Sequence, residues 1–325
     1  MSMAKGAQQR TEKNQNVLNL TEEQAREHVE KLLWPDGQPI CRQCGSVNAY
    51  RMKGKSCRPG LCRCRDCKKQ FTVTVGTIFE DSHLPLSTWV KAIHLMCSSK
   101  KGISALQLMR NLGLGSYRTA WFMAHRIRWA MKCEPMAGML KGQVQADETY
   151  VGGKFRVGSG EDRKSQYENK TPVVVMVESR EGGQAVAYPL PQVNAKSLRS
   201  ALVGVVDAAA HIVTDEHSSY PLASATFASH QTVNHSIKEY SRKVVDNDWN
   251  VQTITTNTAE SFFSLLKRGV YGTFHHVSKK HLHRYTDEFS FRWNGRTISD
   301  SARRDLAVKM VEGKRLMYRV PVGEA

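Results

Sequence analysis

The sequence predicts a multidomain α+β protein in which a small cysteine-rich module and a helical region precede a mixed α/β domain. The chain has 325 residues and 40% hydrophobic content, which is long for a single domain. Six of the eight cysteines lie between residues 41 and 67. From residue 141 onward, segments of alternating polar and apolar residues replace the helical spacing of the first half. Two or three separately folded units are therefore expected.

The charge of the chain indicates a polyanionic partner. Lys and Arg number 47 against 30 Asp and Glu, a formal net charge of +17 at pH 7. Such an excess favours nucleic acid, and double-stranded DNA is the expected partner, with a merely basic surface as the alternative. The longest apolar run, residues 173–177, is far shorter than the roughly 20 residues of a membrane span. The N-terminus lacks the apolar core of a signal peptide, so a cytoplasmic protein without membrane contact is expected.

The cysteine spacing within residues 39–76 predicts a structural zinc ribbon. Cys41-x-x-Cys44 is followed after 19 residues by Cys64-x-x-Cys67. Two tight turns of this kind can supply four thiolates at the corners of a tetrahedron, which is the coordination that structural Zn²⁺ prefers. We therefore expect these four cysteines to be the zinc ligands.

Two further cysteines in the same segment leave the ligand set open. Cys57 and Cys62 lie between the two pairs, and the stretch CRCRDC offers Cys62 as a substitute ligand. The segment is also strongly basic, because residues 41–70 hold nine Lys or Arg and one acidic residue, Asp66. We expect a ribbon of this charge to contact phosphate groups.

Residues 17–38 and 84–133 have the spacing of helices. TEEQAREHVEKLLW offers Thr21 as N-cap and Gln24 at the capping-box position. ISALQLMRNLGLG and SYRTAWFMAHRIRWAM are two helical segments joined by a glycine turn, which is typical of a helix-turn-helix. The basic residues of the second segment that we expect to contact DNA are Arg118, Arg126 and Arg128. An ordinary amphipathic helix with a solvated basic face is the alternative.

The second half predicts a mixed sheet with acidic residues at the ends of its strands. GQVQADETYV alternates, so Asp147 and Thr149 share one face of a strand. Two strands, a helix and a strand ending at Asp215 follow, then a helix, a strand, an irregular stretch and a helix that contains Glu260. Two strand-end aspartates and a glutamate on a packed helix can converge on a pair of divalent cations. Taken alone, each aspartate also fits a turn or cap.

Several longer motifs resemble one family. GTIFEDSHLPLSTW, TAWFMAHRIRWAM, DETYVGGK, TDEHSSY and NTAESFFSLLKRGVYGTFHHVSKKHLHRYTDEFSFRWNGR are similar to bacterial insertion-sequence transposases that join an N-terminal zinc ribbon to a DDE domain of ribonuclease H-like fold. The resemblance spans roughly residues 30–296. It implies a DDE domain over residues 141–296, after which we expect a helical tail over residues 297–325.

The resemblance also implies site residues. The three carboxylates that would form the catalytic triad and bind two Mg²⁺ or Mn²⁺ ions are Asp147, Asp215 and Glu260. Lys267 lies nearly two helical turns after Glu260 on the same face, so we expect it and the adjacent Arg268 to hold DNA. Relatives can use asparagine as the third ligand, which makes Asn257 the alternative. The stretch NTAE also fits a capping box with Asn257 as N-cap, a purely structural role for both residues.

The activity implied by the resemblance is metal-dependent cleavage and strand transfer of DNA at the ends of an insertion sequence. Such an enzyme needs both element ends and target DNA, and paired ends favour a homodimer or a higher oligomer. Two alternatives remain. One is a zinc-ribbon regulator that binds DNA without cutting it, and the other is a ribonuclease H-like nuclease that cleaves without strand transfer.

Overall fold

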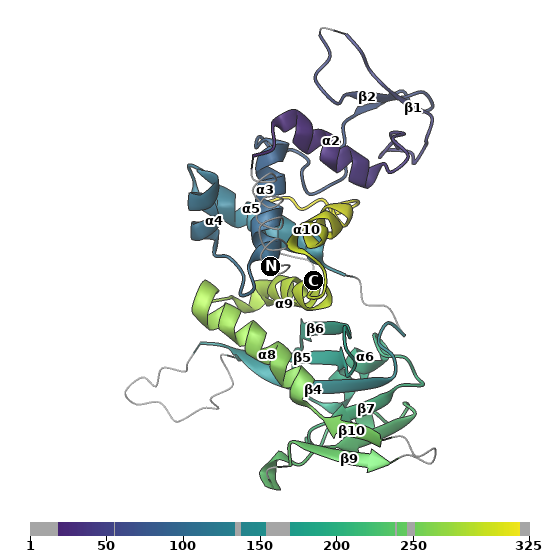
Figure 1. Cartoon of the computed structure of the whole chain (residues 1–325), viewed down its shortest axis with the longest axis vertical. Coiled ribbons are helices and arrows are strands. Elements are labelled where there is room, and N and C mark those ends of the chain that lie inside the picture. The colour runs from purple at the N-terminus through teal and green to yellow at the C-terminus, as the bar shows by residue number, and fades with distance from the viewer. Residues whose placement is uncertain are drawn as a thin grey trace, which may run out of the picture. The chain divides into compact units, whose positions relative to one another are not determined.

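The computed structural model describes residues 19–54, 56–133, 138–153, 170–237, 239–245 and 251–318 (Figure 1). The chain divides into two compact units. The first combines Met1–Met131 with Ile298–Ala325, and the second is Lys132–Thr297. Over the described residues, no helix has both the length and the apolar character that a membrane span requires.

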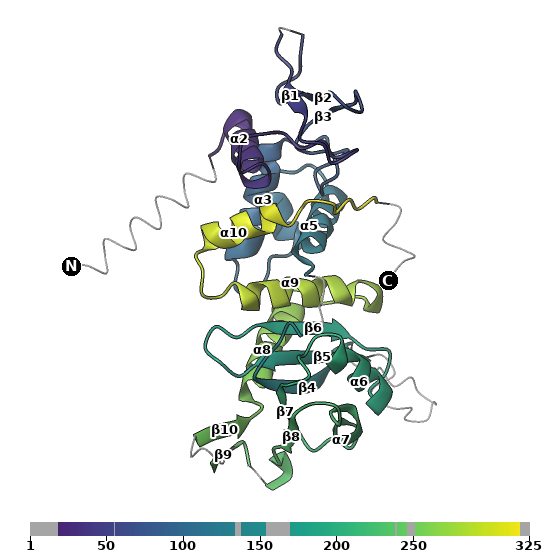
Figure 2. The same ribbon diagram turned by 90° about the vertical axis from the view of Figure 1, so that its right-hand side faces the viewer.

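The first unit is built from a ribbon and a group of helices. Its helices are α2 (Glu22–Leu33), α3 (Leu86–Ser98), α4 (Ala105–Leu112), α5 (Tyr117–Met131) and α10 (Asp300–Lys309). The predicted capping box of α2 is present, with Thr21 and Gln24 bonded reciprocally. Helix α10 comes from the C-terminal segment and packs on α2, α3 and α5, so the predicted tail contributes to the core of the first unit (Figure 2).

The ribbon and the helix pair form as the sequence predicts. The ribbon is an antiparallel sheet of β1 (Ala49–Arg51), β2 (Cys62–Cys64) and β3 (Gln70–Phe71), in that order. Helices α4 and α5 are joined by a turn in which Gly113 has a φ of 64°, a conformation that glycine adopts without strain. Ser104 caps the start of α4 through the backbone N–H of Gln107.

The second unit is a mixed α/β domain around a five-stranded sheet. The strands are β4 (Gln143–Gly152), β5 (Lys170–Glu178), β6 (Ala185–Pro189), β7 (His211–Thr214) and β8 (Ser229–Thr232). Their order is β6-β5-β4-β7-β8, with β4, β5 and β6 antiparallel and β7 and β8 parallel to β4. Strand β4 is therefore the central strand, where the antiparallel half of the sheet meets the parallel half.

Helices cover both faces of this sheet (Figure 2). Helices α6 (Ala195–Val203) and α7 (Tyr220–Ala223) pack on one face, in a core with Val144 and Ile212. Helices α8 (Asn257–Gly269) and α9 (Leu282–Asn294) pack on the other, through a core that includes Phe262 and Phe289. A short π-helical turn, η2 (Val270–Phe274), ends α8, and η3 (Lys279–His281) precedes α9.

The stretch expected to be irregular contains a strand pair. After η1 (His235–Ile237), strands β9 (Ser241–Val245) and β10 (Val251–Thr255) pair antiparallel. Ile254 and Val244 pack on Val213 and Val233 in a small third cluster. Most of β9 is exposed, so it shows neither the alternation that predicted β4 nor the apolar runs that predicted β5 and β7.

Candidate functional site

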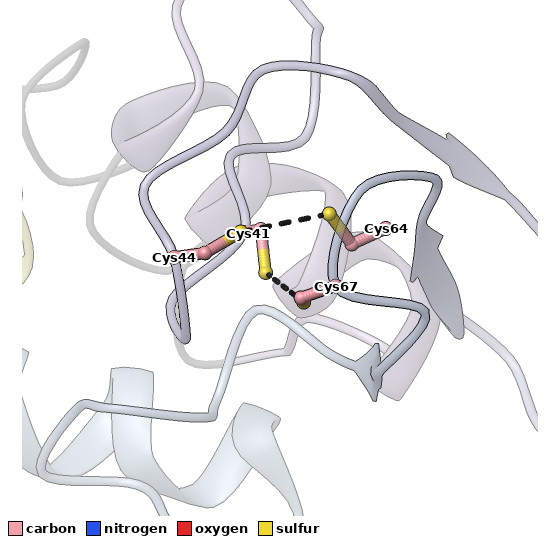
Figure 3. Close-up of side chains that lie close together, drawn as sticks. All are labelled: Cys41, Cys44, Cys64 and Cys67. Atoms are coloured by element: carbon pink, nitrogen blue, oxygen red, sulfur yellow. Dashed lines mark hydrogen bonds between the residues drawn. The ribbon is translucent and has the colours of Figure 1, made fainter.

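The four predicted cysteines converge in the ribbon (Figure 3). The sulfurs of Cys41, Cys44, Cys64 and Cys67 all lie within 4.8 Å of one another. Two pairs are in direct contact, Cys41 with Cys67 at 3.6 Å and Cys44 with Cys64 at 3.7 Å. Four sulfurs bound at ~2.3 Å to one tetrahedral ion would lie ~3.8 Å apart. The group therefore fits a structural zinc ion.

The surrounding backbone and one carboxylate organise this group. The backbone N–H groups of Cys67 and Asp66 donate to the Cys64 sulfur and lower the pKa of its thiol to about 7, which favours the thiolate that zinc binds. Asp66, the one acidic residue of the basic segment, accepts hydrogen bonds from Ser46 and from Asn48 Nδ2 at 2.8 Å. It thereby ties together the two turns that carry the cysteine pairs.

The two remaining cysteines of the ribbon lie outside this group. The buried Cys62 has its sulfur 3.7 Å from the carbonyl oxygen of Gly60, and burial raises the pKa of its thiol to about 11. Cys57 is partly buried and is not among the cysteines that gather within 4.8 Å. The geometry thus favours the two CxxC pairs over a set that includes Cys62.

Two of the predicted carboxylates lie on adjacent strands of the second unit. Strand β4 pairs with β7 in parallel register, Gln145 opposite Val213. Continuing this register by two residues puts Asp215, which follows the end of β7, opposite Asp147 on the same face of the sheet. The prediction that Asp147 lies at the end of a strand is wrong, because β4 continues beside β5 to Gly152. The strand that ends at this point is β7.

The pKa of Asp147 reports the proximity of these acids. Burial raises it first, and repulsion from Asp215, Glu148 and Glu260 raises it further, to about 7, although the backbone N–H of Glu148 donates to Asp147 and lowers it. Carboxylates that repel one another in a partly buried site are stabilised when a cation binds between them. The structure thus brings the three predicted acids into one electrostatic neighbourhood.

Glu260 reaches this neighbourhood from the first turn of α8. Its side chain is 49% exposed, and His235 Nε2 lies 3.6 Å from its Oε1. The helix begins at Asn257 with Thr256 as N-cap, and Thr256 makes no side-chain capping bond. The alternative of a capping box with Asn257 as N-cap is therefore wrong, because Asn257 is already the first helical residue. The side chains of Asn257 and Glu260 are both exposed.

The three carboxylates are not gathered as tightly as the cysteines. Among the described residues, the group of three or more candidate metal-binding side chains with all ligand atoms within 4.8 Å is the cysteine group alone. A site for two cations does not require such closeness. Ions ~3.5–4 Å apart, each ~2.0–2.1 Å from its oxygens, are held by ligands that are farther from one another than the ligands of a single ion.

Comparison with known proteins assigns the chain to a family. The family model of the ISXO2-like transposase domain matches residues 139–294, and that of the transposase zinc-ribbon domain matches residues 20–70. The first match covers most of the second unit, and the second covers α2 and nearly all of the ribbon. The chain carries a transposase zinc ribbon and an ISXO2-like transposase domain.

Two further proteins are similar to this transposase. A protein of Halobacterium salinarum, described as an uncharacterized protein in transposable element ISH50, is 26% identical over 289 residues, covering 84% of this chain and 91% of the relative. The solved Drosophila P element transposase strand transfer complex contains a chain with 10% identity and a TM-score of 0.24. That likeness covers 66% of this chain and 58% of the other, and it is too weak to bear on the fold.

The arginines of the helix-turn-helix in this transposase do not all face outward. Arg126 is 5% exposed, donates to the backbone oxygen of Glu80 and stacks on Trp89. Arg128 is 2% exposed. The expectation that these two side chains contact DNA is therefore corrected, because both are buried. Arg118 is exposed, near the start of α5, with its guanidinium 4.2 Å from the ring of Tyr318.

The basic residues predicted on α8 are accessible. Lys267 and Arg268 are exposed near the end of the helix, and Arg268 Nε donates to the backbone oxygen of Ser264 at 3.0 Å. Glu260 and Lys267 thus share the exposed side of α8, as their spacing predicts. In the ribbon, Arg63 and Arg65 are exposed as well.

Three features around the transposase carboxylates were missed from the sequence. Tyr220 is buried in α7 and donates its hydroxyl to Glu148 Oε2 at 2.5 Å, which links the segment after Asp215 to β4. His235 lies beside Glu260. Gln145 bonds to the start of α8. Each link joins positions far apart in the chain, so no local spacing could have indicated it.

Proposed function

We propose that this transposase is a DDE-type enzyme that cleaves DNA at the ends of its element and joins those ends to target DNA. The observation that carries the proposal is the shared neighbourhood of Asp147, Asp215 and Glu260, expressed in the raised pKa of Asp147. The strand order, with three antiparallel strands followed by two parallel ones, supports a ribonuclease H-like domain.

The residues present fit two Mg²⁺ or Mn²⁺ ions. All three acids offer oxygen ligands, which hard divalent cations prefer. Among the described residues, no lysine or arginine is among the groups that shift the pKa of Asp147, so no cationic side chain of this kind offsets the repulsion that it feels from the other acids. Asp147, Asp215 and Glu260 would hold the ions. Bound there, the ions would activate a water or a DNA 3′-hydroxyl and stabilise the charge on the leaving oxygen.

The protein's own cations would hold the DNA. Lys267 and Arg268 lie on the exposed side of the helix that carries Glu260, which suits contact with phosphates next to the reacting one. Arg118 lies near the start of α5, the part of a recognition helix that meets base edges. The exposed arginines of the ribbon add contacts to phosphate that do not depend on DNA sequence.

The working assembly would be a homodimer or larger, because two element ends must be brought together on one target. It would act in the cytoplasm, on chromosomal or plasmid DNA. The element's terminal repeats and a target duplex would be its DNA partners.

The decisive experiment incubates the protein with a labelled element-end duplex, a target plasmid and Mg²⁺. A joined product is expected from the parent protein and absent from Asp215→Asn. Binding without cleavage would favour a regulator, and cleavage without joined product would favour a nuclease. Either result would contradict strand transfer.

A further inference from the structure

Gln145 forms a polar link between the central strand and the helix that carries Glu260. Gln145 is 1% exposed and lies two positions before Asp147, on the same face of β4. Its Oε1 accepts hydrogen bonds from the backbone N–H groups of Thr258 at 2.9 Å and Ala259 at 3.1 Å. Thr258 and Ala259 directly precede Glu260 and lie 113 and 114 positions after Gln145 in the chain.

The link provides what the helix start itself does not. The first N–H groups of a helix have no partner within the helix, and a side chain at the N-cap usually accepts from them. In α8 the N-cap Thr256 makes no such bond. Gln145 supplies the acceptor from a different element, so the start of α8 is held to β4 (Figure 1).

The orientation of the Gln145 amide is fixed by its partners. Two N–H donors face Oε1, while Nε2 donates to Ser179 Oγ at 2.9 Å. The reversed amide would direct an NH₂ group at two N–H donors. The buried side chain therefore uses both ends of its amide, which makes the link directional and costly to break.

We infer that Gln145 is a positioning residue that sets the placement of Glu260 relative to Asp147. The inference rests on the proposed function, in which these two acids hold the metal ions. Asp147 lies two positions after Gln145 on one strand, and Glu260 directly follows Ala259 on one helix. The Gln145 amide therefore connects the backbone next to one carboxylate with the backbone next to the other.

A purely structural role and a positioning role have different consequences. Loss of a structural link lowers the melting temperature and leaves metal affinity unchanged below the melting transition. Loss of a positioning link also weakens metal binding, because residues that orient metal ligands typically contribute 10–100-fold to affinity. Metal binding by the folded, DNA-free protein is therefore the informative measurement.

The test compares Mn²⁺ binding, measured by electron paramagnetic resonance on the zinc-loaded, DNA-free protein, in the parent and four variants. Gln145→Met removes both ends of the amide, and we expect ~10-fold weaker Mn²⁺ binding. Gln145→Glu keeps the acceptor facing the N–H groups of α8, and a carboxylate there also suits the helix dipole, so binding should be no weaker than in the parent. Ser179→Ala is the matched control, since it removes the other partner of the amide, and it should stay within about 3-fold.

The fourth variant, Asp147→Asn, separates the two levels of the proposal. If it binds Mn²⁺ as the parent does, the ions are not held by this acid and the proposed function fails together with the inference. If Asp147→Asn abolishes binding while Gln145→Met matches the parent, the proposed function stands and the role of Gln145 is overturned. Should Gln145→Met not fold, Gln145→Ser replaces it, because its small side chain leaves room for a water to bond the two N–H groups. The same ~10-fold loss is expected, and parent-like binding would overturn the role.

Discussion

The two candidate metal sites of this transposase are built in opposite ways. In the ribbon, all four ligands come from a stretch of 27 residues, and their sulfurs already lie within 4.8 Å of one another. In the second unit, the acids from Asp147 to Glu260 span 114 residues, and burial together with repulsion among them raises the pKa of Asp147 to about 7. One site is local and the other is assembled by the fold.

This difference predicts what each metal does. The ribbon sheet has three short strands of three, three and two residues, too little to fold on its own hydrophobic core, so its metal is part of its stability. Asp147 and Asp215 lie on or directly after strands of a five-stranded sheet, and Glu260 lies on a helix packed against it. This sheet has apolar clusters on both faces, so it needs no ion to stay folded. Removing zinc should unfold one region, whereas removing magnesium should stop chemistry and leave the sheet folded.

Loss of a ribbon ligand should have the largest effect. In Cys64→Ser the zinc ion is released, and with it a binding free energy that is about 10–16 kcal/mol in small zinc modules. Metal content by atomic spectroscopy and melting followed by circular dichroism would measure this, with the second unit keeping its transition. Cys62→Ser is the control and should retain zinc. If zinc-free Cys64→Ser bound element ends as tightly as the parent, the DNA-facing role of the ribbon would be wrong.

Loss of one carboxylate should stop cleavage without unfolding the protein. Glu260→Gln keeps the size of the side chain and removes a charge that the cations require, so strand cleavage should fall roughly 10³-fold, or ~4 kcal/mol in activation free energy. Single-turnover cleavage, DNA binding and thermal melting measure the three properties separately. An active Glu260→Gln beside an inactive but folded Asn257→Ala would transfer the ligand role to Asn257.

The local features of this contrast could be read from the sequence. The spacing of Cys41, Cys44, Cys64 and Cys67 specified the ribbon ligands, and the Thr21 capping box marked the start of α2 within one residue. Alternation placed Asp147 on a strand, and chain order gave the sequence of strands and helices around it. Each of these features depends on residues near one another in the chain.

Features that depend on distant contacts could not be read in the same way. Helical periodicity shows that Arg126 and Arg128 lie on α5, but not that Trp89 and Glu80 would enclose the Arg126 guanidinium. The pattern NTAE satisfied the capping-box rule, yet the helix starts one residue earlier, and the N–H groups of its first turn bond to Gln145 of β4. A local rule fails where a tertiary contact meets the same need.

The stability of the metal-free carboxylate site should depend on pH. The pKa of Asp147 is raised from 3.8 to about 7, so folding favours its protonated form. The stability that this proton provides is complete below about pH 4 and is lost as the pH rises through about 7. Asp147→Asn mimics the protonated acid and should be more stable than the parent at pH 8, by on the order of 4 kcal/mol, and close to it in stability near pH 4.

Thermal melting in EDTA, with zinc restored to the ribbon or the ribbon transition resolved separately, would check this difference. Millimolar Mg²⁺ should stabilise the parent at pH 8 and have little effect on Asp147→Asn. A metal-free parent as stable as the variant at pH 8 would show that burial and the neighbouring acids do not raise the pKa of Asp147.

The smallest expected effect concerns Asn257. If this residue were the N-cap of α8, Asn257→Ala would cost ~0.5–2 kcal/mol of stability. In the structure it is the first helical residue, it is exposed, and the N–H groups of Thr258 and Ala259 bond to Gln145 instead. The loss should therefore stay within about 0.5 kcal/mol, as for an ordinary surface position. Chemical denaturation of Asn257→Ala beside Gln145→Met separates the two assignments, because the Met variant removes the acceptor that the helix start uses. A larger loss of stability for Asn257→Ala than for Gln145→Met would mean that α8 is capped by its own residues. The carboxylate site would then depend less on the bond from Gln145, and its assembly would be more local, like that of the ribbon.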